Sequence, residues 1–348
     1  MDANKAKITT IIPTYKRPKL LKRTIASVLA QTYPFLEVCI YDNASNDETK
    51  DIVMAFVRQD PRVKYHCHSQ NIGSGPNFQY GLSRVETPLF SFLSDDDFLL
   101  PWFYENAMGA FERFPEGAFF AGSLLYVTEK KRVVKVGIAT DEEEIFLSNT
   151  TAIERMMQGT FPLWTSVVFR KKVKEAIGSL DLNVGPFDSD FLLRTAAHFP
   201  GIASNQICAL FLRHSSSFSV APELSFVWPG WKAMINRFMQ EESLPQHIRL
   251  EGEKRMHQNV RKMLYLVLLT SIAKKNFSQA QESVELLQGL YGHKTFKKAI
   301  LLIIKSCNRY DLLQKGFVFL LNSLFWMKET LKKIKWQKKY GKFAQYLE

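Results

Sequence analysis

The stretch Phe90-Ser-Phe-Leu-Ser-Asp-Asp-Asp-Phe-Leu-Leu-Pro101 places three consecutive carboxylates, Asp95, Asp96 and Asp97, directly after a short apolar run. The run from Pro88 to Leu93 has the length and composition of one buried strand. Like charges this close repel unless a cation lies among them, and carboxylates without a neighbouring His or Cys suit Mg2+ or Mn2+ better than zinc. The same acids would also suit a helix cap near Pro101, because Asp complements the helix macrodipole.

Strand and helix patterns alternate before this stretch. Apolar and β-branched runs predict strands at 8–15, 35–41 and 63–67, and a helical apolar period predicts a helix from Pro18 to Gln31. Asp47 is placed to cap a second helix that runs toward Val57, and the segment from Asn71 to Asn77 leads into a third. The alternation predicts an α/β fold with a mostly parallel sheet and helices on both faces.

Polar residues follow each predicted strand. Ligands of such sheets bind beyond the carboxyl ends of the strands. We therefore expect one crevice, lined by Pro13, Thr14, Tyr15, Asp42, Asn43, Asn71, Asp95, Asp96 and Asp97. Each motif alone is typical of a turn or a strand end, so the evidence lies in their order. The chain has neither a Gly-x-Gly-x-x-Gly after the first strand nor a Gly-x-x-x-x-Gly-Lys-Ser/Thr motif, which argues against a dinucleotide dehydrogenase and a P-loop protein.

With these motifs in this order, the chain resembles the family 2 nucleotide-sugar glycosyltransferases of the GT-A fold, from about Lys7 to about Ser219. The resemblance implies that Asp42 hydrogen-bonds the base of the donor nucleotide. Asn43 stands where the family usually has a second acid. The resemblance also implies that the nucleoside is bordered by Pro13, Thr14, Tyr15 and Arg17. It implies that the ribose and pyrophosphate lie near Asn71, Gly73 and Asn77.

The family's Asp-x-Asp motif falls on Ser94-Asp95-Asp96, so its first acid is missing. The resemblance makes Asp96 the metal ligand and Asp95 a ribose contact, with Mn2+ or Mg2+ as the cofactor. His214 resembles the family's His beside a closing loop, which meets the pyrophosphate or the metal, with Arg213 as a phosphate neighbour. A single His is otherwise most often structural, and this alternative stays open.

Asp188 is the candidate catalytic base. It lies six residues before Arg194, the spacing of the general base that deprotonates the acceptor hydroxyl in the family, although Phe187 replaces the usual Glu. Because a bound cation neutralises a nucleoside diphosphate leaving group, one base is enough, and one in-line displacement inverts the anomeric centre. The alternatives are that Asp188 only caps its helix, or that Asp190 is the base.

Composition and charge describe the rest of the 348 residues, whose net charge is +12. We expect a catalytic domain at 1–220 and a helical, basic extension at 221–348. From Gly292 to Glu348 there are 13 Lys and Arg against 3 acids, and the basic residues interrupt every apolar run before the roughly 18 residues that a membrane span needs. This pattern favours contact with an anionic membrane surface, with a packed bundle or a homodimer interface as alternatives. Nucleic-acid motifs are absent.

The amino terminus lacks an apolar signal core, and the four cysteines have no metal-site spacing. Both features predict a cytoplasmic protein, and the basic extension predicts that it lies on the inner face of the membrane. The function that we expect is an inverting, metal-dependent transfer of sugar from a nucleotide-diphosphate sugar, UDP-sugar above all, to a glycan or lipid-linked acceptor. The alternatives are a catalytically inactive nucleotide-sugar-binding protein, a membrane-surface scaffold and a sugar-1-phosphate nucleotidyltransferase. The last would need a Gly-rich loop where Thr14-Tyr-Lys-Arg-Pro18 stands.

Overall fold

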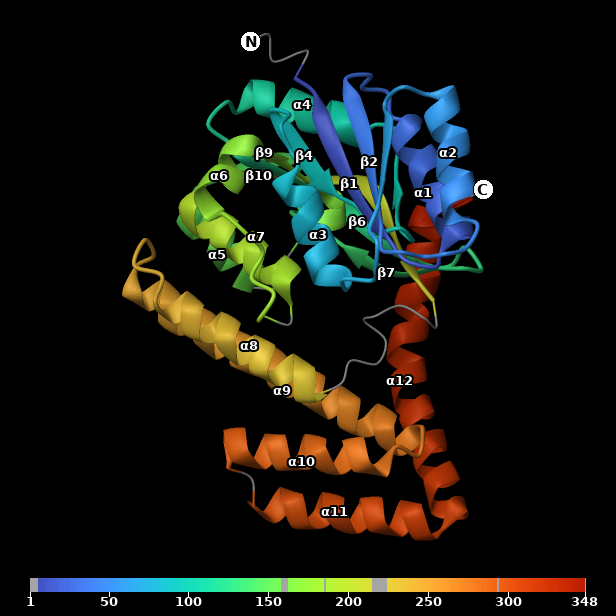
Figure 1. Cartoon of the computed structure of the whole chain (residues 1–348). Coiled ribbons are helices and arrows are strands. Elements are labelled where there is room, and N and C mark those ends of the chain that lie inside the picture. The colour runs from blue at the N-terminus through green and yellow to red at the C-terminus, as the bar shows by residue number, and fades with distance from the viewer. Residues whose placement is uncertain (1–5, 158–161, 185, 215–223, 293, 348) are drawn as a thin grey trace.

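The computed structural model describes residues 6–157, 162–184, 186–214, 224–292 and 294–347. Strands and helices alternate through the first two hundred residues, and helices alone follow (Figure 1). The elements, in chain order, are β1 (Ile8–Thr14), α1 (Pro18–Leu29), β2 (Leu36–Asp42), α2 (Thr49–Gln59), β3 (Val63–Cys67), α3 (Ser74–Ser83), β4 (Leu89–Phe92), β5 (Phe98–Leu99), α4 (Phe103–Arg113), β6 (Phe119–Thr128), β7 (Val133–Gly137), β8 (Glu144–Leu147), α5 (Asn149–Met157), η2 (Trp164–Ser166), β9 (Val167–Arg170), α6 (Lys171–Ile177), α7 (Phe187–His198), β10 (Gly201–Arg213), α8 (Leu224–Met239), α9 (Gln246–Ala273), α10 (Phe277–Tyr291), α11 (Lys294–Arg309), α12 (Asp311–Tyr340) and η4 (Gly341–Leu347).

The described strands form one ten-stranded sheet in the order β3-β2-β1-β4-β9-β6-β10-β5, with β7 paired to β6 and β8 to β10. The first four strands of this order run parallel, which confirms the parallel sheet predicted from the alternating pattern. β9 then joins the two halves by antiparallel pairing with β4 and β6, while β6 and β10 pair in parallel. β1 lies in the middle of the parallel half, so its carboxyl end is flanked by those of β2 and β4.

Helices cover both faces of the sheet because the strands are apolar on both sides. On one face Leu21 of α1 and Phe103 of α4 pack with Ile8, Ile12 and Ile40. The other face packs Phe78 of α3 and Phe191 of α7 against Ile11 and Phe92. Each fully buried side chain of this size stabilises the fold by about 1.5–3 kcal/mol relative to an exposed one. This two-sided burial keeps the strand ends rigid where the site forms.

Three capping predictions turn out differently. α7 begins at Phe187 with Pro186 at the N-cap, so Asp188 lies inside the first turn and is not the N-cap that its position suggested. The acids at 95–97 do not cap α4 either, since α4 begins at Phe103, its N-cap is Trp102, and no side chain caps it. At α2 the N-cap is Glu48 rather than the predicted Asp47, although Oδ1 of Asp47 accepts the N–H of Thr49 at 2.9 Å.

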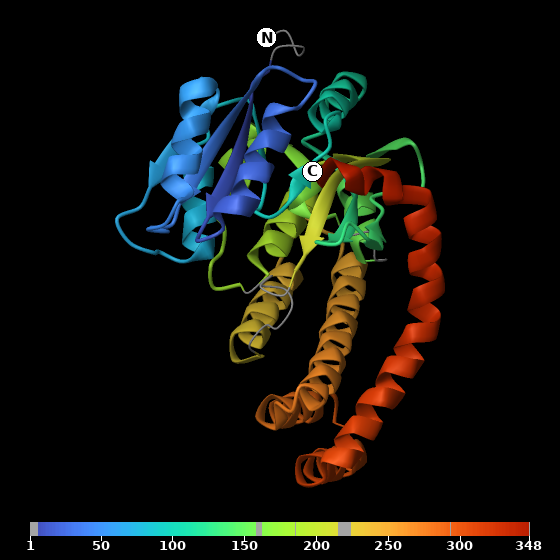
Figure 2. The ribbon, with the colours of Figure 1, turned by 90° about the vertical axis from the view of Figure 1, so that its right-hand side faces the viewer.

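Helices α8 to α12 form an arm that extends from the sheet (Figures 1 and 2). Its apolar side chains, such as Val260 of α9 and Val284 of α10, belong to the same continuous buried cluster as Phe191 of α7. The chain then returns along α12 to the sheet, where η4 packs beside Trp102, with ring centroids 5.8 Å apart for Trp102 and Tyr346. Among the described residues, no helix has the length and apolar character needed to cross a membrane.

Candidate active site

The loops that follow β1 and β4 are hydrogen-bonded to each other. Oγ1 of Thr14 donates to Oδ2 of Asp95 at 2.8 Å, and the N–H of Tyr15 lies 3.4 Å from the same oxygen. Nη1 of Arg17 reaches Oδ1 of Asp95 at 3.1 Å and Oδ2 of Asp96 at 2.9 Å. The structure therefore brings together five of the predicted site residues, from segments about eighty positions apart.

The acidic loop is also held through its backbone by α1. Oγ1 of Thr24 donates to the carbonyl oxygens of Asp95 and Asp97 at 3.0 and 2.8 Å, and Nη2 of Arg23 donates to that of Asp96 at 3.1 Å. The sequence reasoning missed both residues of α1. Their signal was weak, because a Thr and an Arg within an amphipathic helix are ordinary, although Thr24 falls on its buried face.

Asp97 differs from its two neighbours. It is fully buried, and it accepts hydrogen bonds from Oγ1 of Thr165 at 2.8 Å and from the N–H of Leu212 at 3.0 Å. Loss of hydration, together with the charge of Asp96, raises the pKa of Asp97 well above its usual range. These contacts tie the acidic loop to η2 and β10, so Asp97 has a structural role.

Asp96 lies between the side chains of Arg17 and His214. Nε2 of His214 is 2.9 Å from Oδ2 of Asp96, the same oxygen that Arg17 contacts. Burial, followed by the charge of Asp96, raises the pKa of Asp95 to about 6, against the opposing effect of Arg17. The described residues contain no group of three or more His, Cys, Asp and Glu side chains gathered as a metal site. Asp96 and His214 nevertheless offer a carboxylate and an imidazole at one point, a donor pair that suits Mn2+.

A second group of polar side chains lies at the end of β2. Nδ2 of Asn43 donates to Oδ1 of Asn71 at 2.8 Å, and hydrogen bonding to Asn71 lowers the pKa of Tyr15. Asp42 is buried and accepts the N–H of Ser45 at 3.0 Å and the hydroxyl of Tyr65 at 2.7 Å. The ends of β1 and β2 thus share one border, as the strand order predicted.

Asn77 and Pro13 are buried inside α3 and β1. Asn77 is buried within α3, where its Nδ2 donates to the carbonyl oxygen of Tyr41 at 2.8 Å and its Oδ1 lies 2.9 Å from Nε2 of His68. Pro13 pairs with Tyr41 inside the parallel ladder. The contacts of Asn77 serve to join α3 to β2 and β3, and its role toward a ligand stays a prediction.

Asp188 and Asp190 have different surroundings although both lie in the first turn of α7. Asp190 is 2% exposed and accepts Nε of Arg194 at 2.8 Å and Nη1 of Arg237 at 2.8 and 2.9 Å. Asp188 is half-buried, has no ion pair among the described residues, and has a pKa raised by loss of hydration. A base must be able to take a proton, so Asp188 suits that role better than Asp190, whose charge is already neutralised.

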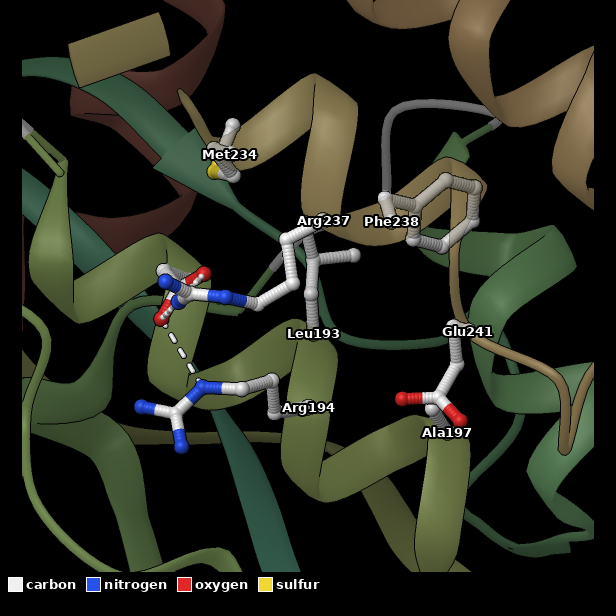
Figure 3. A pocket seen from close by; sticks show the side chains of 8 residues that line it. Leu193, Arg194, Ala197, Met234, Arg237, Phe238 and Glu241 are labelled. Atoms are coloured by element: carbon white, nitrogen blue, oxygen red, sulfur yellow. Dashed lines mark hydrogen bonds and ion pairs between the residues drawn. The ribbon is translucent and has the colours of Figure 1, made fainter. Parts of the chain in front are cut away.

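Arg237 also contacts Asp181, which precedes α7, so one side chain of α8 holds two acids. Figure 3 shows Arg194 and Arg237 at the pocket between α7 and α8. The pocket has a volume of about 10 Å³, roughly the space of one water molecule. It is too small for a sugar and lies away from the acidic loop. Its lining residues are Asp190, Leu193, Arg194, Ala197, Met234, Arg237, Phe238 and Glu241.

Comparison with known proteins agrees with this arrangement. The family model described as "Glycosyl transferase family 2" matches residues 9–178. A segment of 96 residues is 38% identical to the GalNAc(5)-diNAcBac-PP-undecaprenol beta-1,3-glucosyltransferase of Campylobacter jejuni, covering 27% of this chain and 31% of that protein. A segment of 90 residues is 30% identical to a putative teichuronic acid biosynthesis glycosyltransferase of Bacillus subtilis, covering 26% of this chain and 36% of that protein.

The fold has a close likeness among solved structures. Residues 1–349 of S. aureus TarS, in complex with UDP-GlcNAc, superpose with a TM-score of 0.63 at 13% identity. The likeness covers 90% of this chain and 89% of that one, so it includes the helical arm as well as the sheet. At 13% identity the comparison establishes the GT-A fold alone, so the chemistry has to be argued from the side chains of this chain. The two curated relatives above are matched over only about a third of their own length.

Proposed function

Because this chain belongs to glycosyltransferase family 2, we propose that it transfers a sugar from a nucleotide-diphosphate sugar, most naturally a UDP-sugar, to an acceptor hydroxyl with inversion at the anomeric carbon. The acceptor that we propose is a glycan or a lipid-linked glycan in the synthesis of a cell-surface polymer. Two relatives support this class, since one is named for a polyprenyl-diphosphate-linked acceptor and the other for teichuronic acid synthesis. Both are matched over part of their length only, so the substrates are proposals here.

The observation that carries the proposal is the meeting of Asp96, Arg17 and His214 at the carboxyl ends of β1, β4 and β10. A family 2 donor brings two phosphates that need positive charge, and the guanidinium of Arg17 is 30% exposed at this point. Asn71 and Tyr15 lie at the border where the nucleoside would bind, with Asp42 buried behind them. In this arrangement Asp95 is the ribose contact.

A divalent cation fits the same point. Asp96 and His214 would hold Mn2+ or Mg2+, and the donor phosphates and water would complete the coordination, as is usual for such ions at phosphate sites. The cation would neutralise the charge that develops on the leaving diphosphate. Arg17 contributes to the same neutralisation from the protein side.

Asp188 is the base in this proposal. It would accept the proton of the acceptor hydroxyl while that oxygen attacks the anomeric carbon and the bond to the diphosphate breaks. Its raised pKa suits a base near neutral pH better than an ordinary Asp would. Asp190 and Arg194 hold the turn of helix that carries it.

A panel of nucleotide sugars tests the function. Thermal stability is measured with and without Mn2+, and sugar release and transfer are measured on the same samples. We expect one nucleotide class to stabilise wild type in the presence of Mn2+, because ligand binding to the native state raises stability. Stabilisation without turnover on any acceptor or water would favour the inactive binding protein, and no stabilisation at all would contradict the proposal.

The far end of the helical arm is the part that we propose contacts an anionic membrane. Leu312 and Leu313, at the corner between α11 and α12, are 81% and 52% exposed, and Leu302, in the middle of α11, is 67% exposed. Lys305 and Arg309 are exposed beside them, and Figure 1 places this corner farthest from the sheet. Trp336 also belongs to the basic extension, but it lies away from this corner and packs with Tyr340 and η4 against the sheet. The alternative to membrane contact is that this corner forms a homodimer interface.

A further inference from the structure

A row of side chains crosses three neighbouring strands near the acidic loop. Lys135 of β7 is the register partner of Tyr126 of β6, and Tyr126 is the partner of Phe211 of β10. Nζ of Lys135 lies 4.7 Å from the centroid of the Tyr126 ring, whose centroid is 5.2 Å from that of Phe211. Arg213 follows Phe211 by two positions, so its side chain leaves the sheet on the same face.

Lys135 and Arg213 therefore leave β7 and β10 on the same face of the sheet, with β6 between them. The structure gives neither Lys135 nor Arg213 an ion pair with any described residue, and both are exposed. Burial of the side-chain stem lowers the pKa of Lys135, and the charge of Arg213 lowers it further. Paired cations that repel each other and lack a counterion are an arrangement that a bound anion would relieve.

The hydroxyl of Tyr126 adds a neutral donor to this row. The ring is largely enclosed, and burial raises the pKa of Tyr126 to about 12, while Arg213 opposes this effect and the charges of Asp97 and Asp188 add to it. No hydrogen bond to this hydroxyl is found within the described residues. A cavity of about 10 Å³ borders the ring, between Tyr126, Gly137 and Leu163.

We propose that Lys135, Arg213 and the hydroxyl of Tyr126 form a subsite for a phosphate group of the acceptor. This inference rests on the proposed function and names the acceptor as one that carries a phosphate near the reacting sugar. The subsite is separate from the donor diphosphate. Successive side chains of an extended strand point to opposite faces, so Arg213 turns toward Tyr126 while His214 turns toward Asp96. A lipid-linked diphosphate and a phosphodiester polymer would present the same group.

Isothermal titration calorimetry with inorganic pyrophosphate, in EDTA, tests the subsite without needing turnover. We expect Lys135→Ala and Arg213→Ala each to weaken pyrophosphate binding about tenfold, and Tyr126→Phe about threefold. Lys130→Ala removes the same charge from an exposed position on the turn between β6 and β7, and should stay within twofold of wild type. Lys135→Arg should retain binding, because the charge is kept.

The donor site is the main alternative location for the probe, and Arg17→Ala reports on it. Loss of binding in Arg17→Ala with full binding in Lys135→Ala would place the pyrophosphate at the donor site and overturn the subsite. Equal losses in Lys135→Ala and Lys130→Ala would reduce the effect to net charge and would overturn it too. Wild type that does not bind pyrophosphate would have the same consequence. None of these results depends on the chain being a transferase.

Kinetics with three acceptors distinguish the sources of the phosphate. The same saccharide is offered as a short-chain polyprenyl diphosphate, as a phosphodiester-linked fragment, and without phosphate. We expect Lys135→Ala to raise the KM of one phosphate-bearing acceptor about tenfold, and to leave that of the neutral saccharide and the affinity for the nucleotide unchanged. A uniform fall in kcat for all three would show that the variant acts on the fold and would contradict the subsite.

Discussion

Arg237 of α8 and Asp190 of α7 are joined by two contacts, with Nη1 of Arg237 2.8 Å from Oδ1 and 2.9 Å from Oδ2 of Asp190. Because Asp190 is buried beside the proposed base, this pair links the helical arm to the catalytic helix. Arg194 shares the same carboxylate and also donates to the carbonyl oxygens of Ile177 and Ser179. The arm is therefore coupled to the turn that presents Asp188.

Arg237→Ala should lower the free energy of unfolding by about 1–3 kcal/mol. The reason is that Asp190 would keep only Arg194 as a partner for a buried charge, and a charged hydrogen bond is worth about this much. Urea denaturation measures the change. Arg255→Ala is the control, since its partner Glu251 is 46% exposed and the loss should stay within about 0.5 kcal/mol. Equal losses in the two variants would contradict the linkage.

Asp96→Ala should abolish transfer and the Mn2+-dependent part of nucleotide stabilisation, and leave the fold intact. Ser94→Ala should be milder, because a hydroxyl is a weak ligand. Asp97→Ala should instead lower thermal stability, because it leaves the N–H of buried Leu212 and the hydroxyl of Thr165 without their acceptor. Thermal shift with UDP and Mn2+ separates the three. If wild type and Asp96→Ala bind Mn2+ with equal affinity, the ligand assignment is wrong.

Asp188→Asn should slow transfer by a factor on the order of 10²–10⁴ and leave nucleotide binding unchanged, the usual effect of losing a positioned base. Asp190→Asn should show its main effect on stability, because Asp190 pairs with Arg194 and Arg237. Steady-state kinetics and denaturation on both variants test the division. An active Asp188→Asn beside an inactive, stable Asp190→Asn would move the base to residue 190.

The pH dependence of kcat/KM should also show that Asp188 is the base. Burial raises the pKa of Asp188, so kcat/KM of wild type should rise with pH through a value above the ordinary range of Asp, and Asp188→Asn should lack this limb. Asp188 affects the stability of the fold in the opposite direction, because its contribution falls as pH rises. A raised folded-state pKa contributes stability that is present below the unfolded-state pKa and lost as pH rises through the folded-state value. At neutral pH Asp188→Asn should therefore be at least as stable as wild type.

Leu312→Glu with Leu313→Glu should reduce co-sedimentation with anionic vesicles at least twofold, because the exposed apolar corner of the arm would lose its contact with lipid. Leu250→Glu with Leu266→Glu is the matched control on α9, where these leucines are 50% and 52% exposed. Binding of wild type should fall as salt rises, since each basic residue near the surface contributes roughly 1 kcal/mol. Wild type that ignores vesicles and dimerises instead would favour the homodimer.

These point variants are better tests of the arm than removal of residues 292–348. Such a truncation would also remove η4, whose Ala344 is buried, and the contact between Oε1 of Gln337 and the N–H of Val133 at 2.7 Å. The edge of the sheet at Trp102 would lose its cover. Aggregation of the truncated chain would then report on the lost packing rather than on membrane contact.

The sequence by itself determined the family, the alternation of strands and helices, and the positions of the polar strand ends. These are local properties, because a strand alternates with a period of 2 and a helix with 3.6, and a parallel sheet brings its carboxyl ends together whatever the details of packing. Thr14, Arg17, Asp95 and Asp96 meet for this reason.

Only the tertiary structure decided how chemically identical side chains divide their roles. Asp97 is structural because Thr165 and Leu212, 68 and 115 positions away, reach it, and Asp190 is neutralised because Arg237 of α8 folds back onto α7. The same holds for Trp336, which packs on the sheet although it belongs to a basic, aromatic tail. A carboxylate's pKa and accessibility depend on what surrounds it in space, and residues this far apart along the chain leave no periodic signal of their contact.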